Sequence, residues 1–277
     1  MTIKFDKIGA WSELKLDIVG KYGAAYTGTF RNFPGIKKFY IDAFSGAGEH
    51  ISKASGERVE GSPSRALKVK PPFDHLYFID LEAKKTNYLR SLYGDNPKVT
   101  IKTGDATQIL TQKILPPIKY EDYKRALCLL DPYGLDLDWQ VIEMAGKLGT
   151  IDIFLNFPVM DMNRNAIWRN PDNVPPDGIE RMNRFWGDES WREVAYKDHP
   201  QLKLFSAPDK EKQDNDIIAT AFGERLRQVA GFNYVAKPLP MSNSKNAIVY
   251  YLMLASPKEV ARDIIEDIFS KYRKHRG

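Results

Sequence analysis

YIDAFSGAGEH, residues 40–50, joins a short apolar strand to a turn made of small residues. The apolar run covers Lys37–Phe44 and ends at Gly46, where the lack of a side chain lets a ligand approach the backbone closely. An ordinary tight turn has the same composition. This stretch therefore predicts a strand and a turn, and its further meaning depends on the strands that follow.

Four more apolar runs of strand length follow, each bounded by turn residues. They are His75–Asp80, Val99–Lys102, Arg125–Leu130 and Thr150–Phe157. The stretches between them have helical spacing: one helix begins at Ser62 and Pro63, and others are expected over 82–92 and 137–148. This alternation predicts a mostly parallel sheet with helices on both faces.

The end of the chain has a different pattern. Tyr234–Leu239 and Ile248–Ala255 are strand-like, and the polar link between them suits an antiparallel hairpin. An amphipathic helix is expected over Lys258–Tyr272. We expect an N-terminal helical segment over 1–35, the first part of an α/β domain over 36–158, a helical insertion over 159–214, and completion of the domain over 215–277.

The expected insertion is rich in tryptophan and arginine, chiefly within 161–208. It contains Trp168, Trp186 and Trp191 together with Arg164, Arg169, Arg181, Arg184 and Arg192. Arginine beside tryptophan suits phosphate contacts and base stacking, so the segment is a candidate for recognition of a substrate or partner. The alternative is that the tryptophans pack a small helical subdomain and the charges face solvent.

Composition excludes several classes of protein. The 277 residues are 43% hydrophobic and 28% charged, which excludes wholesale disorder, and the formal net charge is +5. The longest apolar run, Ala247–Ala255, is too short to span a membrane, and we expect a cytoplasmic protein without a membrane partner. The single cysteine, Cys128, lies in an apolar strand and is expected to be buried. The four scattered histidines predict no metal site.

Polar residues follow three of the expected strands. Asp80 ends the second strand, Gly104–Ala106 (GDA) follows the third, and Asp131–Gly134 (DPYG) follows the fourth. Asp80 has a plain structural explanation as a helix cap and DPYG as a turn, while GDA alone carries no meaning. However, the carboxyl ends of parallel strands meet at the edge of the sheet where such folds bind ligands. The carboxylate of Asp131 and the carbonyl of Pro132 can both accept protons from one amino group, and Tyr133 can stack on a flat base.

These motifs, in this order, resemble class I S-adenosylmethionine-dependent methyltransferases and, more closely, the three-Cys-motif partner protein family. The matching stretches are WSELK (11–15), YIDAFSGAG (40–48), GSPSRAL (61–67), FID (78–80), GDA (104–106), DPYG (131–134), NFPVMDMNRN (156–165) and YYLMLAS (250–256). The resemblance implies a Rossmann-like class I methyltransferase sheet, S-adenosylmethionine as cofactor, and a partner protein that carries three cysteines.

The resemblance also implies roles for particular residues. The methionine part of the cofactor would be held by Asp42, Phe44, Ser45, Gly46 and Gly48. The ribose would be held by Asp80, the adenine by Asp105 and Ala106, and the methyl acceptor would face Asp131, Pro132 and Tyr133. Weaker candidates for substrate binding are Lys15, Asn163, Arg164 and Asn165. Lys15 lies off the stripe of Trp11, Leu14 and Ile18 that is expected to pack the first helix on the domain.

The identity of the methyl acceptor stays open at this point. DPYG lacks the second proline of the Asp/Asn/Ser-Pro-Pro-aromatic tetrad found in amino-group methyltransferases. The exocyclic amino group of a nucleic-acid base is our first hypothesis. The alternatives are a subunit that is inactive without its cysteine-motif partner and a small-molecule methyltransferase.

Overall fold

A twisted sheet forms the centre of the molecule. The computed structural model describes residues 5–198 and 210–273. The strands are β2 (Lys37–Asp42), β5 (His75–Asp80), β6 (Val99–Thr103), β7 (Lys124–Leu130), β8 (Ile151–Phe157), β11 (Tyr234–Val235), β12 (Leu239–Ser242) and β13 (Ile248–Ser256). In space they follow the order β11-β13-β8-β7-β2-β5-β6, and β12 also pairs with β13. The pairs among β6, β5, β2, β7 and β8 are parallel, whereas β13 is antiparallel to β8, β11 and β12. This is the Rossmann-like class I methyltransferase fold, as predicted.

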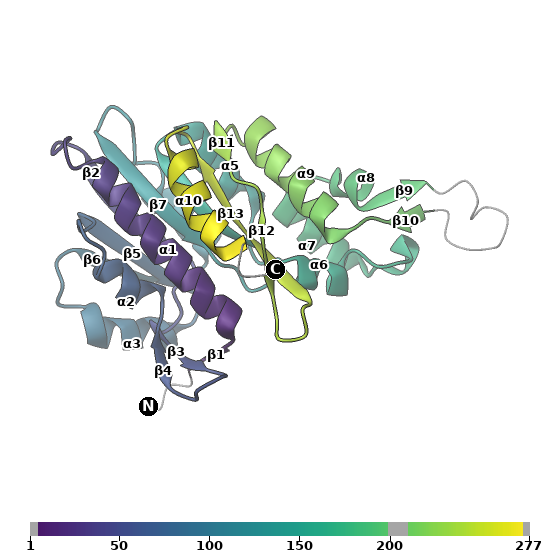
Figure 1. Ribbon diagram of the computed structural model, residues 1–277, viewed down its shortest axis with the longest axis horizontal. Helices are drawn as coiled ribbons and strands as arrows, with labels where there is room; N and C mark the ends of the chain where they lie inside the picture. The colour runs from purple at the N-terminus through teal and green to yellow at the C-terminus, as the bar shows by residue number, and fades with distance from the viewer. Residues whose placement is uncertain (1–4, 199–209, 274–277) are drawn as a thin grey trace.

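Helices cover both faces of the sheet because strand residues alternate between two apolar clusters. Leu127 and Leu129 pack into one cluster, while Cys128 and Leu130 pack into the other. The first face carries α1 (Ala10–Thr29), α2 (Ser62–Leu67), α3 (Ala83–Tyr93) and α10 (Ala261–Arg273). The second carries α4 (Ala106–Ile109), the π-helix η1 (Leu110–Ile114), α5 (Trp139–Leu148) and α9 (Asn215–Gln228). In Figure 1, α1 and α10 lie side by side across the sheet.

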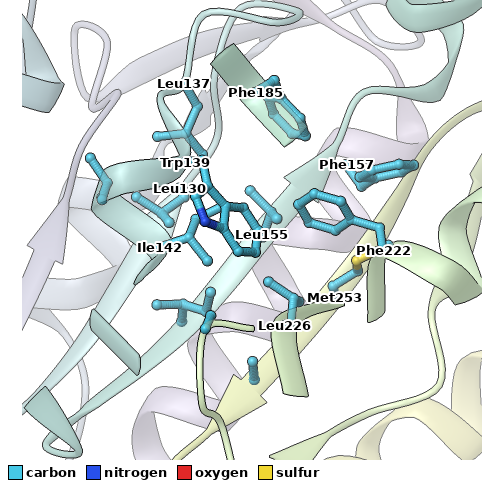
Figure 2. Packing of buried hydrophobic residues seen from close by; sticks show 14 of the residues in the cluster. Leu130, Leu137, Trp139, Ile142, Leu155, Phe157, Phe185, Phe222, Leu226 and Met253 are labelled. Atoms are coloured by element: carbon cyan, nitrogen blue, oxygen red, sulfur yellow. The ribbon is translucent and has the colours of Figure 1, made fainter. Parts of the chain in front are cut away.

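Aromatic side chains join the insertion to the sheet. Phe157 at the end of β8, Phe185 and Phe222 gather around one another, with ring centroids 4.8 to 6.0 Å apart. Figure 2 shows these rings beside Trp139, Leu155 and Met253. Because all these residues are buried, the insertion shares the core of the domain.

The insertion consists of short elements after β8. They are α6 (Val159–Asn165), the 3-10 turn η2 (Pro171–Asn173), α7 (Pro176–Trp186), α8 (Trp191–Ala195) and the antiparallel pair β9 (Tyr196–Asp198) and β10 (Lys210–Lys212). Trp186 and Trp191 are 2% and 1% exposed, and their indole N–H groups donate to Ser190 and Asn183. These two tryptophans are buried, as the alternative interpretation expected, but they pack into the core of the whole domain and not into a separate small subdomain. Residues 199–209 of the expected insertion lie outside the described residues.

A small sheet near the N-terminus is absent from the sequence prediction. It contains β1 (Lys7–Ile8), β3 (Glu49–Ser52) and β4 (Arg58–Glu60) in the order β1-β3-β4. Strands this short have no alternating pattern of their own, so only the pairing between distant segments creates them. The sheet brings the start of the chain beside the glycine turn.

The expected strand over 234–239 is two strands, β11 and β12. Pro238, between the two strands, lacks the N–H that a continuous ladder needs, so β11 ends at Val235 and pairing with β13 resumes in β12 at Leu239. Cys128 is buried, as predicted, and burial raises the pKa of its thiol. Within the described residues, no helix has both the length and the apolar character that crossing a membrane requires.

Candidate functional site

Two adjoining cavities lie at the carboxyl edge of the parallel strands, and Phe44 and Tyr133 line both. The first, here called the Asp131 cavity, measures about 370 Å³. Its lining includes Asp6, Ser12, Lys15, Phe44, Ser45, Gly46, His50, Ser62, Asp131, Pro132, Tyr133, Asn156 and Tyr250. The second, the Asp80 cavity, measures about 600 Å³. Its lining includes Phe44, Asp80, Leu81, Glu82, Gly104, Asp105, Ala106, Tyr133, Asp136, Asp138 and Arg184.

Asp131 is held by one residue from α1 and one from β8. It stands directly after β7, where it pairs with the ammonium of Lys15 and accepts a 2.8 Å hydrogen bond from the Asn156 amide. Lys15 is buried on α1, and Ile18 and Val19 of the same helix pack into the apolar cluster on the first face of the sheet. The sequence selected Lys15 and Asp131 separately, and the structure brings them into contact.

Asp161, which the sequence analysis did not assign, fixes the DPYG loop. Its carboxylate accepts the backbone N–H of Leu135 at 3.1 Å. Gly134 has a φ of +63°, and a Cβ there would lie 2.2 Å from an Asp161 oxygen. Gly134 is therefore required both by the backbone conformation and by this close approach.

The Tyr133 ring stands between the two cavities. Its hydroxyl accepts a hydrogen bond from Lys85 at 3.0 Å and donates to Asp6 at 3.2 Å. Lys85 is also bonded to Glu82 at 2.7 Å, so α3 and the N-terminal segment both restrain the ring. Although 58% exposed, Tyr133 is thus held in one position.

Asp80 connects the glycine turn to the start of α3. Its two oxygens accept the backbone N–H groups of Gly46 and Glu82, each at 2.9 Å. The N-cap residue of α3 is Glu82, so Asp80 fixes the chain just before the helix and does not cap it. Each carboxylate oxygen keeps a second lone pair for a ligand hydroxyl. Gly46 has a φ of +60°, and no atom lies within 4 Å of where its Cβ would be, so there is open space above the turn.

Asp105 caps α4 and lines the Asp80 cavity together with Ala106. One of its oxygens accepts the Gln108 N–H at 2.8 Å. The other has no hydrogen bond within the described residues and can accept from a ligand.

Asp42 lies beneath the glycine turn and does not line either cavity. It is fully buried, and neither carboxyl oxygen has a hydrogen bond of normal geometry in the described residues. Burial raises its pKa to about 7, the nearby negative charge of Asp131 adds to the rise, and the Ser62 hydroxyl offsets part of it.

Sequence reasoning missed several residues of the Asp131 cavity. Asn156 is a polar residue near the carboxyl end of a largely apolar strand, which is a signal that could have identified it. His50 and Tyr250 carried no such signal, because only the fold brings β3 and β13 to this cavity. Burial lowers the pKa of His50, so its imidazole is neutral near pH 7.

Some predicted site residues lie away from the two cavities. The carbonyl of Gly48 accepts hydrogen bonds from the N–H of Gly61 and the hydroxyl of Ser64, so Gly48 joins the glycine turn to the start of α2. Asn163 and Asn165 are bonded to Asn215 and Asp161, and Arg164 is exposed; none of these three lines either cavity. Within the ranges 5–198 and 210–273, no group of three or more His, Cys, Asp or Glu side chains could hold a metal ion.

Comparison with known proteins finds a solved structure of similar fold but no similar sequence. No protein-family model matches the chain, and no curated protein matches its sequence. Among solved structures, it is similar to the Legionella pneumophila protein LPL1258, with a TM-score of 0.53 and 13% identity over 93% of this chain and 91% of that one. Two weaker likenesses are to the DszA carbon methyltransferase and to a SAM-dependent methyltransferase from Leishmania major. The first has a TM-score of 0.45 and 14% identity over 90% of this chain and 55% of that one; the second has 0.40 and 10% over 87% and 72%.

Proposed function

We propose that this chain is an S-adenosylmethionine-dependent methyltransferase that acts on an exocyclic amino group of a nucleic-acid base. The observation that carries the proposal is the pair of joined cavities, one rich in carboxylates and the other containing Asp131.

The Asp80 cavity suits a nucleoside that bears no phosphate. Its lining has five acids (Asp80, Glu82, Asp105, Asp136 and Asp138) and one basic residue, Arg184. Such a surface accepts hydrogen bonds from ribose hydroxyls and from an adenine amino group, and it repels phosphate. Phe44 and the exposed Leu81 offer apolar surface to a flat ring. These features fit an adenosyl group that carries a positive charge.

The glycine turn would hold the remainder of the cofactor. Ser45 and Gly46 open into the Asp131 cavity, and the open space above Gly46 leaves room for the methionine part. When bound, the cofactor supplies a methyl group that is already activated by its positive sulfur.

The chain's own task is then to position the acceptor nitrogen. The Asp131 carboxylate and the Pro132 carbonyl would accept hydrogen bonds from the amino group, and these two bonds would aim the nitrogen lone pair at the methyl carbon. The Asp131 carboxylate would receive the proton that the nitrogen releases as it gains the methyl group. Lys15 and Asn156 hold the carboxylate in place for this role. A three-Cys-motif protein is part of the proposal as a partner and is supported by the resemblance of the sequence motifs alone.

Calorimetry with S-adenosylmethionine, followed by transfer of tritiated methyl groups to DNA and RNA, tests the proposal. Asp80→Ala should abolish cofactor binding. Asp131→Asn should retain binding and lower transfer at least about a hundredfold. Asp122→Asn, an exposed acid at the opposite edge of the sheet, is the matched control. Absence of cofactor binding by the unmodified protein would refute the proposal, and binding without transfer to either nucleic acid would refute the acceptor.

A further inference from the structure

A third cavity, here called the Tyr26 cavity, lies at the opposite edge of the sheet from Asp131. It measures about 350 Å³. Its floor comes from the first residues of β7 and β8 and the last of β13, and its walls come from the end of α1 and the start of α10. Parallel strands begin at this edge and end at the other, so the Tyr26 cavity is separate from the proposed methyl-transfer site.

The walls of this cavity are aromatic and aliphatic. Tyr22, Tyr26 and Phe30 form a row along α1, with ring centroids 6.2 and 5.3 Å apart. At its mouth, Phe33 and Val260 are 58% and 59% exposed. A cavity of this size and lining fits the apolar body of a small ligand.

One polar group inside the cavity is free. Tyr26 is 5% exposed, and its hydroxyl has no hydrogen bond among residues 5–198 and 210–273. This hydroxyl can therefore contact solvent or a ligand in the cavity.

Charge at the cavity is positive where a ligand would enter. Arg125 and Lys258 both line it, and their cationic groups lie 4.2 and 5.5 Å from the centre of the Tyr120 ring. Neither forms an ion pair with an acid in the described part of the chain. The one acid in the lining, Asp152, is buried and accepts hydrogen bonds from Tyr22 at 2.6 Å and Ser256 at 3.0 Å.

Glu259, the acid next to Lys258 in the sequence, does not neutralise the positive charge of Arg125 and Lys258. Glu259 is paired with Arg262 at 2.6 Å.

We propose that the Tyr26 cavity binds a small amphipathic anion, with its carboxylate at Arg125 and Lys258 and its apolar body against Tyr26 and Phe30.

Titration calorimetry with decanoate below its micelle-forming concentration tests this site, with decanol as the probe that has the same body and no charge. Decanoate should bind at least about tenfold more tightly than decanol, because only the anion gains the interaction with Arg125 and Lys258. Lys258→Glu should weaken decanoate binding at least about tenfold, since Lys258 is exposed and its replacement leaves the core intact.

Two controls locate the binding. Lys245→Glu makes the same change of charge in the turn between β12 and β13, at the other edge of the sheet, and should leave decanoate affinity unchanged. Asp131→Asn should also leave it unchanged. No binding of decanoate, equal binding of decanol, or equal effects of the two lysine variants would each overturn the proposal.

Discussion

The contact between Lys15 and Asp131 is the residue-level feature on which the candidate site depends. A buried ammonium without its carboxylate would be costly, whereas the pair with Asn156 leaves both charges compensated. Sequence motifs identified Asp131 because it follows a strand, and they identified Lys15 only as a residue off an apolar stripe. Their pairing across the sheet depends on how α1 is packed, which no local pattern encodes.

Removal of one partner should therefore cost more than removal of both. Lys15→Met should lower the free energy of unfolding by about 2 kcal/mol, less than for a fully buried pair because the Asp131 side chain is 28% exposed. The double variant Lys15→Met/Asp131→Asn should regain part of that loss. Urea unfolding of the four proteins in this cycle measures the coupling, and strictly additive losses would contradict it.

The titration of Asp42 should make the free energy of unfolding depend on pH. Its pKa of about 7 in the folded protein lies above the ordinary 3.8, so between these values the folded state holds a proton that the unfolded chain has released. The contribution of Asp42 to stability is therefore full below about pH 4 and is lost as the pH rises toward 7.

Asp42→Asn should remove this dependence. The variant should gain a few kcal/mol relative to the unmodified protein at pH 8 and little at pH 4. Urea midpoints at the two pH values provide the measurement. An equal effect at both would show that Asp42 does not change its protonation in this range.

Among the elements, uninterrupted apolar strands were predicted to within one or two residues of their bounds. β5 was located without error, since its whole pattern is local. The errors occur where backbone pairing rather than side-chain pattern determines the strand. They are the break at Pro238 between β11 and β12, and the short strands β1, β3 and β4. After β8 the structure has the short elements α6 to β10, and composition alone could not decide whether the tryptophans among them are buried or face a partner.

The two kinds of tryptophan in the insertion should respond differently to truncation. Trp186→Ala should destabilise the protein by about 3–5 kcal/mol, because the indole packs on Phe222 in the core. Trp168 is partly exposed, so Trp168→Ala should cost less than about 1 kcal/mol. Thermal unfolding distinguishes them, and a similar loss for both would contradict this assignment of the core.

At the scale of the whole molecule, the parallel sheet gathers residues from the ends of five strands, β2, β5, β6, β7 and β8, to one edge. The sequence predicted this convergence, because strand ends in such a sheet share an edge. It did not predict the division into two cavities by Tyr133, since Lys85 and Asp6 reach that ring from α3 and the N-terminal segment.

Ligand binding at this edge should stabilise the entire fold. S-adenosylhomocysteine at a hundredfold excess over its Kd should raise the free energy of unfolding by about 2.7 kcal/mol. Asp80→Ala should remove the shift, whereas Trp168→Ala should retain it. A shift that persists in Asp80→Ala would place the ligand elsewhere.

A crystal structure with S-adenosylhomocysteine tests the central claim most directly. We expect the adenine beside Asp105, the ribose hydroxyls on Asp80, and the amino-acid part above Gly46, with Asp131 left facing an open acceptor site. Ligand density outside the Asp80 and Asp131 cavities, or none at saturating concentration, would contradict the account.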